Sequence, residues 1–144
     1  MAMLKPIEWT GAAVRLLDQT RLPDQTVYVE ITDEKQMWDA IRRLVVRGAP
    51  AIGIAAAFGA YLAVRNGASN VHKRLDDACD YLATSRPTAV NLFWALKRMR
   101  DVGHSVADRE VAARLLAECL EMIEEDHRVC RAIGENGLKL LERQ

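Results

Sequence analysis

Two segments of the chain place an arginine immediately before the start of an expected helix. In the first, Arg47-Gly48-Ala49 leads into Pro50, and in the second, Ser85-Arg86-Pro87 leads into Thr88. The first N–H groups of a helix have no partner inside it, so this end attracts anions, and an arginine can clamp an anion through two donors. Gly48 has no Cβ and tolerates positive φ, so backbone can come close to a ligand there. Two such features in one small chain indicate a phosphorylated small molecule.

Both segments also have a purely structural interpretation. An Arg-Gly pair before a helix that begins with proline is common as a C-cap and turn, in which the arginine bonds carbonyls of the preceding helix. Ser-Arg-Pro-Thr is likewise a generic helix break. Neither segment forms a P-loop or a Gly-x-Gly-x-x-Gly fingerprint, so a nucleotide is not specifically indicated. Spacing alone leaves anion binding and a structural role both open.

Other patterns are weaker indications of chemistry. His127 and Cys130 lie three residues apart and could share a metal with Glu124 or Asp126, but no second pair has ligand spacing. We therefore expect no metal there, only a helix surface with a buried thiol. No nucleophile motif surrounds a serine, histidine or aspartate, and no acid–base pair is defined. We assign no catalytic residue in this chain.

The elements that must position the two arginine segments are a small β part and a set of helices. Residues 1–31 contain short β-branched and aromatic runs with Thr10-Gly11 as a turn, which predicts an antiparallel hairpin or small sheet. From Thr32 the apolar period becomes helical, which predicts a bundle of about five to six helices over residues 32–144. The predicted fold class is α+β, mostly helical, with both parts in one domain.

The helix boundaries follow from capping and breaking residues. Thr32 is expected to cap the first helix, whose apolar stripe reaches Arg47, and Pro50 to begin the next, a central one rich in alanine and glycine. Thr88 is expected to cap a later helix, and Ser105 or Asp108 the longest one. Gly134 and Gly137 are expected to interrupt the last helical turns. Residues 138–144 stop in mid-pattern, which indicates a cut chain.

The overall composition limits the partners. The 144 residues carry 20 basic and 20 acidic side chains, so the formal net charge is zero. A neutral chain has no whole-molecule field to attract nucleic acid or an anionic membrane, so we expect neither as a partner. Three cysteines at unpatterned spacing (Cys79, Cys119 and Cys130) fit reduced thiols, and no signal-peptide stretch precedes Pro6. We expect a cytoplasmic protein.

The two arginine segments resemble blocks of a known family, the methylthioribose-1-phosphate isomerases of methionine salvage. The first matching run is Arg47-Gly48-Ala49-Pro50-Ala51-Ile52-Gly53, followed by Ile54-Ala55-Ala56-Ala57-Phe58-Gly59. The second is Ser85-Arg86-Pro87-Thr88-Ala89-Val90-Asn91-Leu92-Phe93-Trp94-Ala95-Leu96. Leu17-Asp18-Gln19-Thr20-Arg21-Leu22-Pro23 and Arg131-Ala132-Ile133-Gly134-Glu135-Asn136-Gly137 also match. Four blocks in family order extend the resemblance over essentially the whole chain.

The resemblance implies an aldose–ketose isomerase that converts 5-methylthioribose 1-phosphate to 5-methylthioribulose 1-phosphate without a metal or organic cofactor. Arg47, Gly48, Ala49 and Arg86 would contact this sugar phosphate. The family also has a Rossmann-like C-terminal domain with a catalytic cysteine in a Thr-His-Cys-Asn block and a catalytic aspartate. Neither the domain nor the block is present here, so we expect an N-terminal substrate-binding domain that is inactive alone. A homodimer is a further expectation, because the family tends to dimerise.

Three alternatives remain. The same superfamily contains ribose-1,5-bisphosphate isomerases and the regulatory subunits of translation initiation factor 2B, so the chain could be a fragment of either. A third interpretation is a non-catalytic helical module that binds a partner through an exposed apolar face. Titration with the sugar phosphate would separate the substrate domain from the interaction module.

Overall fold

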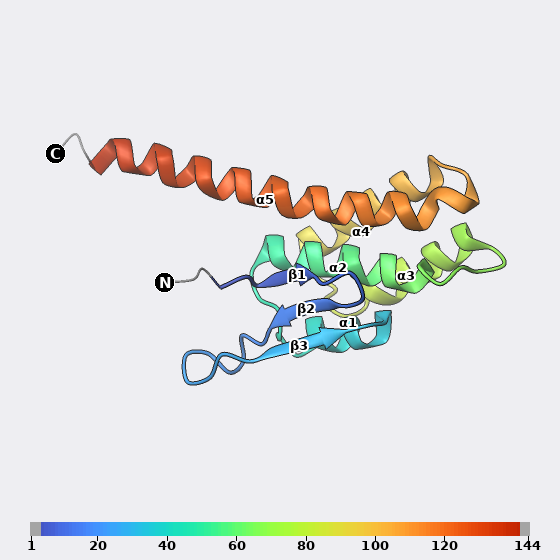
Figure 1. Ribbon diagram of the computed structural model, residues 1–144, viewed down its shortest axis with the longest axis horizontal. Helices are drawn as coiled ribbons and strands as arrows, with labels where there is room; N and C mark the ends of the chain where they lie inside the picture. Colours follow the sequence, from blue (N-terminus) through green and yellow to red (C-terminus); the bar gives the residue numbers. More distant parts are fainter. Residues whose placement is uncertain (1–3, 142–144) are drawn as a thin grey trace.

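The computed structural model, which describes residues 4–141, contains a small sheet packed beside five α-helices (Figure 1). The sheet is antiparallel, with the strand order β1-β2-β3, and its strands are β1 (Ile7–Trp9), β2 (Val14–Leu17) and β3 (Tyr28–Ile31). The helices are α1 (Glu34–Arg42), α2 (Ala49–Val64), α3 (Val71–Ala83), α4 (Val90–His104) and α5 (Val111–Leu141), with a 3-10 turn (Asp108–Glu110) before α5. The predicted mostly helical α+β fold is confirmed.

The sheet attaches to the helices through one apolar face. Strand β2 is the middle strand, and its alternate residues Val14 and Leu16 are fully buried. Trp9 of β1 stacks on Phe58 of α2 with ring centroids 6.2 Å apart. The sheet is therefore part of the same hydrophobic core as the helices.

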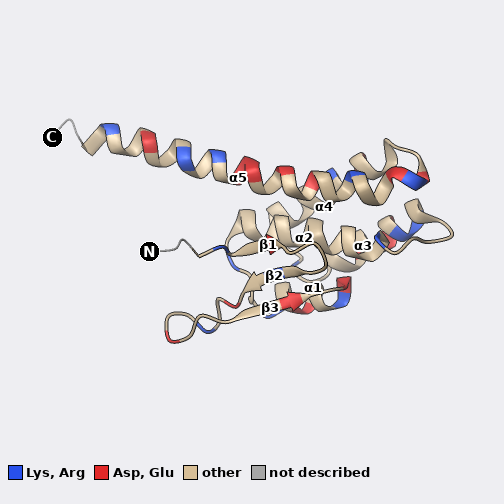
Figure 2. Cartoon of the chain, viewed as in Figure 1, with Lys and Arg blue, Asp and Glu red and all other residues tan. Residues whose placement is uncertain are grey.

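Helix α2 lies at the centre of the molecule and contacts α1, α3, α4 and α5. It has no charged residue, and Figure 2 shows the Lys, Arg, Asp and Glu positions distributed over the surrounding elements. Its small residues allow close approach: a Cβ at Gly59 would lie 3.0 Å from Leu82 of α3 and 3.1 Å from Met37 of α1. The predicted central position of this helix is confirmed.

Helix α5 is one continuous helix of 31 residues. Its first half is buried against α2 and α4 through Val111, Leu115, Cys119 and Met122, whereas residues 128–141 are exposed and extend beyond the other helices (Figure 1). The predicted interruption at Gly134 and Gly137 is wrong, because an isolated glycine costs a helix only about 1 kcal/mol. Within residues 4–141, no helix combines the length and the apolar character needed to cross a membrane.

Candidate anion-binding site at the starts of α2 and α4

The starts of α2 and α4 meet around a cavity of about 410 Å³. It is lined by Gly48, Ala49, Ile52, Arg86, Thr88, Ala89, Val90 and Asn91. Three of the four residues that the sequence singles out for substrate contact (Gly48, Ala49 and Arg86) are thus brought together from segments about forty residues apart. The fourth, Arg47, is exposed and adjoins Gly48 without lining the cavity itself.

A glycine on α2 allows the two helix starts to approach each other. A Cβ at Gly53 would lie 2.9 Å from the backbone oxygen of Asn91 and 3.5 Å from the Cβ of Ala95. A carbon that close to a backbone oxygen would push α4 away. Gly53 therefore sets the separation of the two arginine segments.

The segment before α2 is held by the end of α1. The N–H of Val45 donates to the oxygen of Ala40, at 2.9 Å, and the N–H of Leu44 donates to the oxygen of Ile41, at 3.2 Å. These two bonds form a Schellman motif, with Leu44 in the left-handed position (φ 62°) that glycine usually occupies. Since Val45 and Val46 are buried, the backbone that leads to Arg47 is fixed in position.

Gly48 then turns the chain into α2. Its φ of 93° and ψ of 135° lie in a region that L side chains rarely adopt, so a glycine is needed here. Gly48 occupies the N-cap position of α2 without any side-chain capping bond, and Pro50 follows in the first turn. The start of α2 therefore presents backbone N–H groups that no capping side chain satisfies.

The start of α4 is uncapped in the same way. The predicted cap Thr88 is wrong: Ala89 is the N-cap residue, and no side chain bonds the first turn. By contrast, the Asp33 side chain caps α1 and the Asn70 side chain caps α3. Of these four helices, the two whose N-terminal amides lack a side-chain cap are the two that meet at the cavity.

The loop of Arg86 is anchored to α3 and α1. Ser85 is fully buried and its Oγ donates to the oxygen of Leu82, at 2.7 Å. Arg42 Nη1 of α1 donates to the oxygen of Ser85, at 3.5 Å, and Trp38 Nε1 donates to Thr84 Oγ1, at 2.8 Å. The backbone next to Arg86 is thus fixed, and Arg86 is one of the residues that line the cavity.

The charge at the cavity is positive. Arg86 is the only charged residue in the lining. Within residues 4–141, neither Arg86 nor Arg47 forms an ion pair, although ten other basic side chains do. Two cations without carboxylate partners next to two positive helix ends form a suitable environment for an anion.

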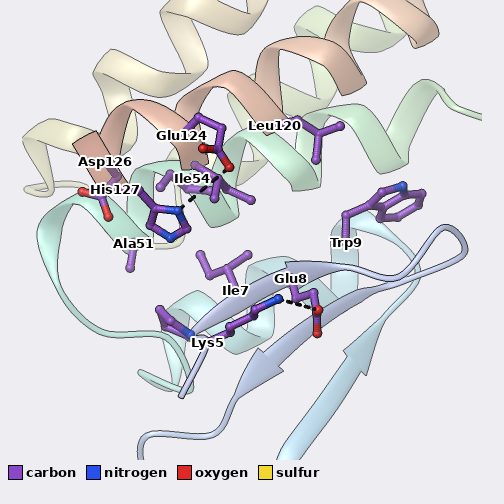
Figure 3. Close-up of a pocket in the computed structure, with 12 residues that line it drawn as sticks. Lys5, Ile7, Glu8, Trp9, Ala51, Ile54, Leu120, Glu124, Asp126 and His127 are labelled. Carbon is purple, nitrogen blue, oxygen red and sulfur yellow. Dashed lines mark hydrogen bonds and ion pairs between the residues drawn. The ribbon is translucent and has the colours of Figure 1, made fainter. Parts of the chain in front are cut away.

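A second cavity, of about 290 Å³, lies between β1 and α5 and is less suited to an anion (Figure 3). Its walls are largely apolar, including Ile7, Trp9 and Ile54, and its polar rim contains the carboxylates of Glu8, Glu124 and Asp126. Lys5 Nζ is already paired with Glu8 Oε1, at 3.2 Å. We do not assign a binding function to this cavity.

The other predicted features do not form a site. In residues 4–141, no three His, Cys, Asp or Glu side chains are grouped so that they could hold a metal ion. Cys130 is exposed, so the expected burial of this thiol is wrong. Cys79 and Cys119 are buried, and burial raises the pKa of Cys79 to about 12 and that of Cys119 well above its usual value. Neither buried thiol is a ready nucleophile.

Sequence reasoning did not identify five of the cavity residues as a group. These are Ile52, Thr88, Ala89, Val90 and Asn91. All five fall within the two family-like blocks, but helix periodicity gives no indication that they line a cavity. These residues line the cavity because of the way α4 crosses α2, and that crossing is a feature of the tertiary structure.

Comparison with known proteins identifies the family. Residues 45–144 match the initiation factor 2 subunit family. The chain is 48% identical over 145 residues to the 5-deoxyribose 1-phosphate isomerase of Moorella thermoacetica, an alignment that covers 96% of this chain and 41% of that protein. It is 45% identical over 145 residues to the methylthioribose-1-phosphate isomerase of Geotalea uraniireducens, with 96% and 42% covered.

Two solved structures have the same fold. Subunit delta of the translation initiation factor eIF-2B from A. fulgidus has a TM-score of 0.80 at 36% identity, covering 86% of this chain and 38% of that one. The 5-methylthioribose 1-phosphate isomerase of Pyrococcus horikoshii has a TM-score of 0.78 at 28% identity, covering 85% and 36%. The chain spans about two fifths of the length of the curated relatives that it matches.

Proposed function

Because the chain belongs to the initiation factor 2 subunit family, we propose that it is the substrate-binding part of a sugar-phosphate isomerase. Its ligand is a ribose 1-phosphate altered at carbon 5, the chemistry common to the names of the two isomerases above. The reaction is the aldose–ketose isomerisation of 5-methylthioribose 1-phosphate to 5-methylthioribulose 1-phosphate. Arg47, Gly48, Ala49 and Arg86 bind the phosphate and the neighbouring part of the sugar.

One observation supports this assignment above the others. The uncapped starts of α2 and α4 and the residue Arg86 surround a single cavity. A phosphate accepts several hydrogen bonds at once, so it uses backbone N–H groups and a bidentate arginine together. The apolar residues Ile52, Ala89 and Val90 also line the cavity. They would contact the uncharged part of the ligand, so that only the phosphate needs a positively charged partner.

In this proposal, residues 1–144 bind the sugar phosphate but do not convert it. Isomerisation of a sugar whose anomeric carbon carries phosphate requires a group that moves a proton between neighbouring carbons. The cavity lining contains no carboxylate, histidine or cysteine. An assay of the purified 144-residue chain is expected to show no turnover, and any isomerisation above the background rate would overturn this part of the proposal.

Calorimetric titration tests the binding site directly. Wild-type chain should bind 5-methylthioribose 1-phosphate, and Arg86→Ala should weaken binding about 10- to 150-fold, since a hydrogen bond to a charged group contributes about 1.5–3 kcal/mol. Arg109→Ala is the matched control, because Arg109 is exposed in the 3-10 turn and forms no ion pair within the described part of the chain. Equal affinities for wild type and Arg86→Ala would refute the assignment.

The similarity to subunit delta of eIF-2B supports a second candidate, a regulatory subunit of that kind. The same titration separates the two. A regulatory subunit that does not use this cavity for a sugar phosphate would give no heat of binding with 5-methylthioribose 1-phosphate, with 5-deoxyribose 1-phosphate or with ribose 1,5-bisphosphate. Preference for the bisphosphate would instead favour the bisphosphate isomerases of the same superfamily.

A further inference from the structure

We infer that Gln19 is a positioning residue for the anion site, in that its side chain fixes the peptide that joins Arg47 to Gly48. This inference rests on the proposed function, since the site that it positions is the proposed phosphate site. Gln19 lies just after β2, 28 residues before Arg47 in the sequence, and is not part of the cavity lining.

A tight turn directs Gln19 toward the segment before α2. The N–H of Asp18 donates to the oxygen of Val27, at 2.8 Å, which extends the pairing of β2 with β3 by one bond. Asp18 Oδ1 then accepts hydrogen bonds from the N–H and the hydroxyl of Thr20, at 3.0 and 2.6 Å. The chain therefore bends at residue 18, and Gln19 leaves the sheet beside the Val45–Arg47 segment.

Gln19 makes two hydrogen bonds to that segment. Its backbone N–H donates to the oxygen of Val45, at 2.9 Å, and its side-chain Nε2 donates to the oxygen of Arg47, at 3.4 Å. The first bond is independent of residue type, whereas the second requires a side chain of this length with a donor at its end. Only the second bond acts on the peptide next to Gly48.

Holding the Arg47 carbonyl also orients the amide of Gly48. A peptide group is planar and trans, so its C=O and its N–H point in opposite directions. When Gln19 holds the oxygen of Arg47 on one side, the N–H of Gly48 must point away from Gln19. Gly48 lines the cavity and has a φ that tolerates rotation of this peptide, so without the side-chain bond its N–H direction would be poorly fixed.

The rest of the segment does not depend on Gln19. Val45 and Val46 are buried, and the Schellman motif at Leu44 holds the chain up to Val45. Removing the side-chain amide therefore leaves the fold in place and releases a single peptide. This separation of fold from site makes the role of Gln19 testable.

The test compares two substitutions at Gln19 with the same two at Gln25. Gln19→Met keeps the length and removes the donor, and Gln19→Glu places acceptor oxygens against the Arg47 carbonyl. Gln25 belongs to the same connection between β2 and β3, is exposed, and makes no side-chain hydrogen bond among residues 4–141, so Gln25→Met and Gln25→Glu are the controls. The measurements are calorimetric affinity for 5-methylthioribose 1-phosphate, the unfolding midpoint, and the 15N-relaxation order parameter of the Gly48 N–H.

We expect Gln19→Met to weaken sugar-phosphate binding about three- to tenfold, the equivalent of one neutral hydrogen bond. Gln19→Glu should have a lower affinity than Gln19→Met. The order parameter of the Gly48 N–H should fall in both Gln19 variants, and both Gln25 variants should match wild type. Unchanged affinity and order parameter in Gln19→Met, with Arg86→Ala still impaired, would overturn this inference and leave the proposed function intact. If Arg86→Ala binds normally, the proposed function fails, and the order parameter of Gly48 still decides whether Gln19 fixes this peptide.

Discussion

At the scale of single residues, the site depends on backbone conformation more than on side-chain chemistry. Gly48 must be glycine because of its positive φ, and it stands between the exposed Arg47 and the first turn of α2. Gly67, in the loop between α2 and α3, has a similar φ of 82° far from the cavity lining. Comparing substitutions at Gly48 and Gly67 therefore separates the stability lost to backbone strain from any loss of ligand binding.

Alanine at either glycine should destabilise the fold, but only alanine at position 48 should affect binding. Gly48→Ala and Gly67→Ala should each lower the free energy of unfolding by about 1–2 kcal/mol, because a Cβ is unfavourable at positive φ. Neither Cβ meets another atom within 4 Å, so the loss reflects strain and not a clash. Only Gly48→Ala should also weaken sugar-phosphate binding, as measured by calorimetry well below the unfolding midpoint. Equal affinities for the two variants would show that Gly48 has no part in the site.

The site residues were partly predictable from the sequence at this scale. Arg86 and Gly48 could be proposed because an arginine or glycine before a helix start has a local physical meaning, whereas Ala49 followed only from the family resemblance. Gln19 could not be connected with Arg47, because the contact joins residues 28 positions apart and leaves no periodic signal. Thr88 and Asn91 line the cavity only because of the angle at which α4 crosses α2.

At the scale of elements, the cavity of the proposed site is formed where α4 crosses α2. Gly53→Ala should lower the free energy of unfolding by about 1–3 kcal/mol, because the new Cβ would lie 2.9 Å from the Asn91 oxygen and the helices would have to separate. The same variant should bind the sugar phosphate more weakly. Gly137→Ala, in an exposed stretch of α5 with no atom near the new Cβ, is the control and should be neutral or stabilising. A neutral Gly53→Ala would contradict the close crossing.

Helices α4 and α5 are joined by a half-buried arginine. Arg98 of α4 contacts Glu118 at 2.5 Å and binds Glu125 through two hydrogen bonds of 2.6 and 2.7 Å, and its guanidinium lies over the ring of Trp94. Arg98→Ala should cost about 2 kcal/mol, less than the 3–5 kcal/mol of a fully buried pair, because Arg98 is 20% exposed and Arg114 still pairs with Glu118. Arg128→Ala removes a surface pair with Glu121 and should change stability by less than about 0.5 kcal/mol. Chemical denaturation of both variants measures the difference.

The pH dependence of stability reports the same contact. The hydrogen bonds from Arg98 lower the pKa of Glu125 below its usual 4.5, so the ionised form is favoured in the folded state. The stability that this provides is complete above the unfolded pKa and is lost as the pH falls through the lower, folded pKa. Wild type should therefore lose more stability between about pH 5 and pH 3 than Glu125→Gln does. An exposed control, Glu135→Gln, should follow wild type, and parallel curves for all three chains would contradict the role of Arg98.

The elements were predicted well in type and less well at their ends. The hairpin, the start of α2 near Pro50 and the break at Ser85-Arg86-Pro87 follow from local residue preferences. The expected caps Thr32 and Thr88 are wrong: Asp33 caps α1 with its own side chain, and α4 begins at Val90 without a side-chain cap. Neither Ser105 nor Asp108 caps α5 directly, because a 3-10 turn comes first. Adjacent polar residues compete for a cap, and sequence alone does not decide between them.

At the scale of the whole molecule, a neutral chain places two unpaired arginines at one end of the bundle. Ten Lys and Arg side chains within residues 4–141 form ion pairs, and Arg47 and Arg86 are among those that do not. The opposite end of the bundle contains the stacked rings of His72 and His104, each next to an aspartate, and so presents no comparable anion site. Binding should therefore affect one end of the bundle and leave the other unchanged.

The most direct test of the central claim is a titration of 15N-labelled chain with 5-methylthioribose 1-phosphate, followed through the backbone amide resonances. We expect saturable shifts of the amide resonances at the two helix starts: Gly48, Ala49, Ala51, Val90 and Asn91. The amide resonances around His72 and Gly103, at the ends of α3 and α4 that lie away from the cavity, should not shift. Shifts confined to other parts of the chain, or none at millimolar ligand, would contradict the claim that these two helix starts form one sugar-phosphate site.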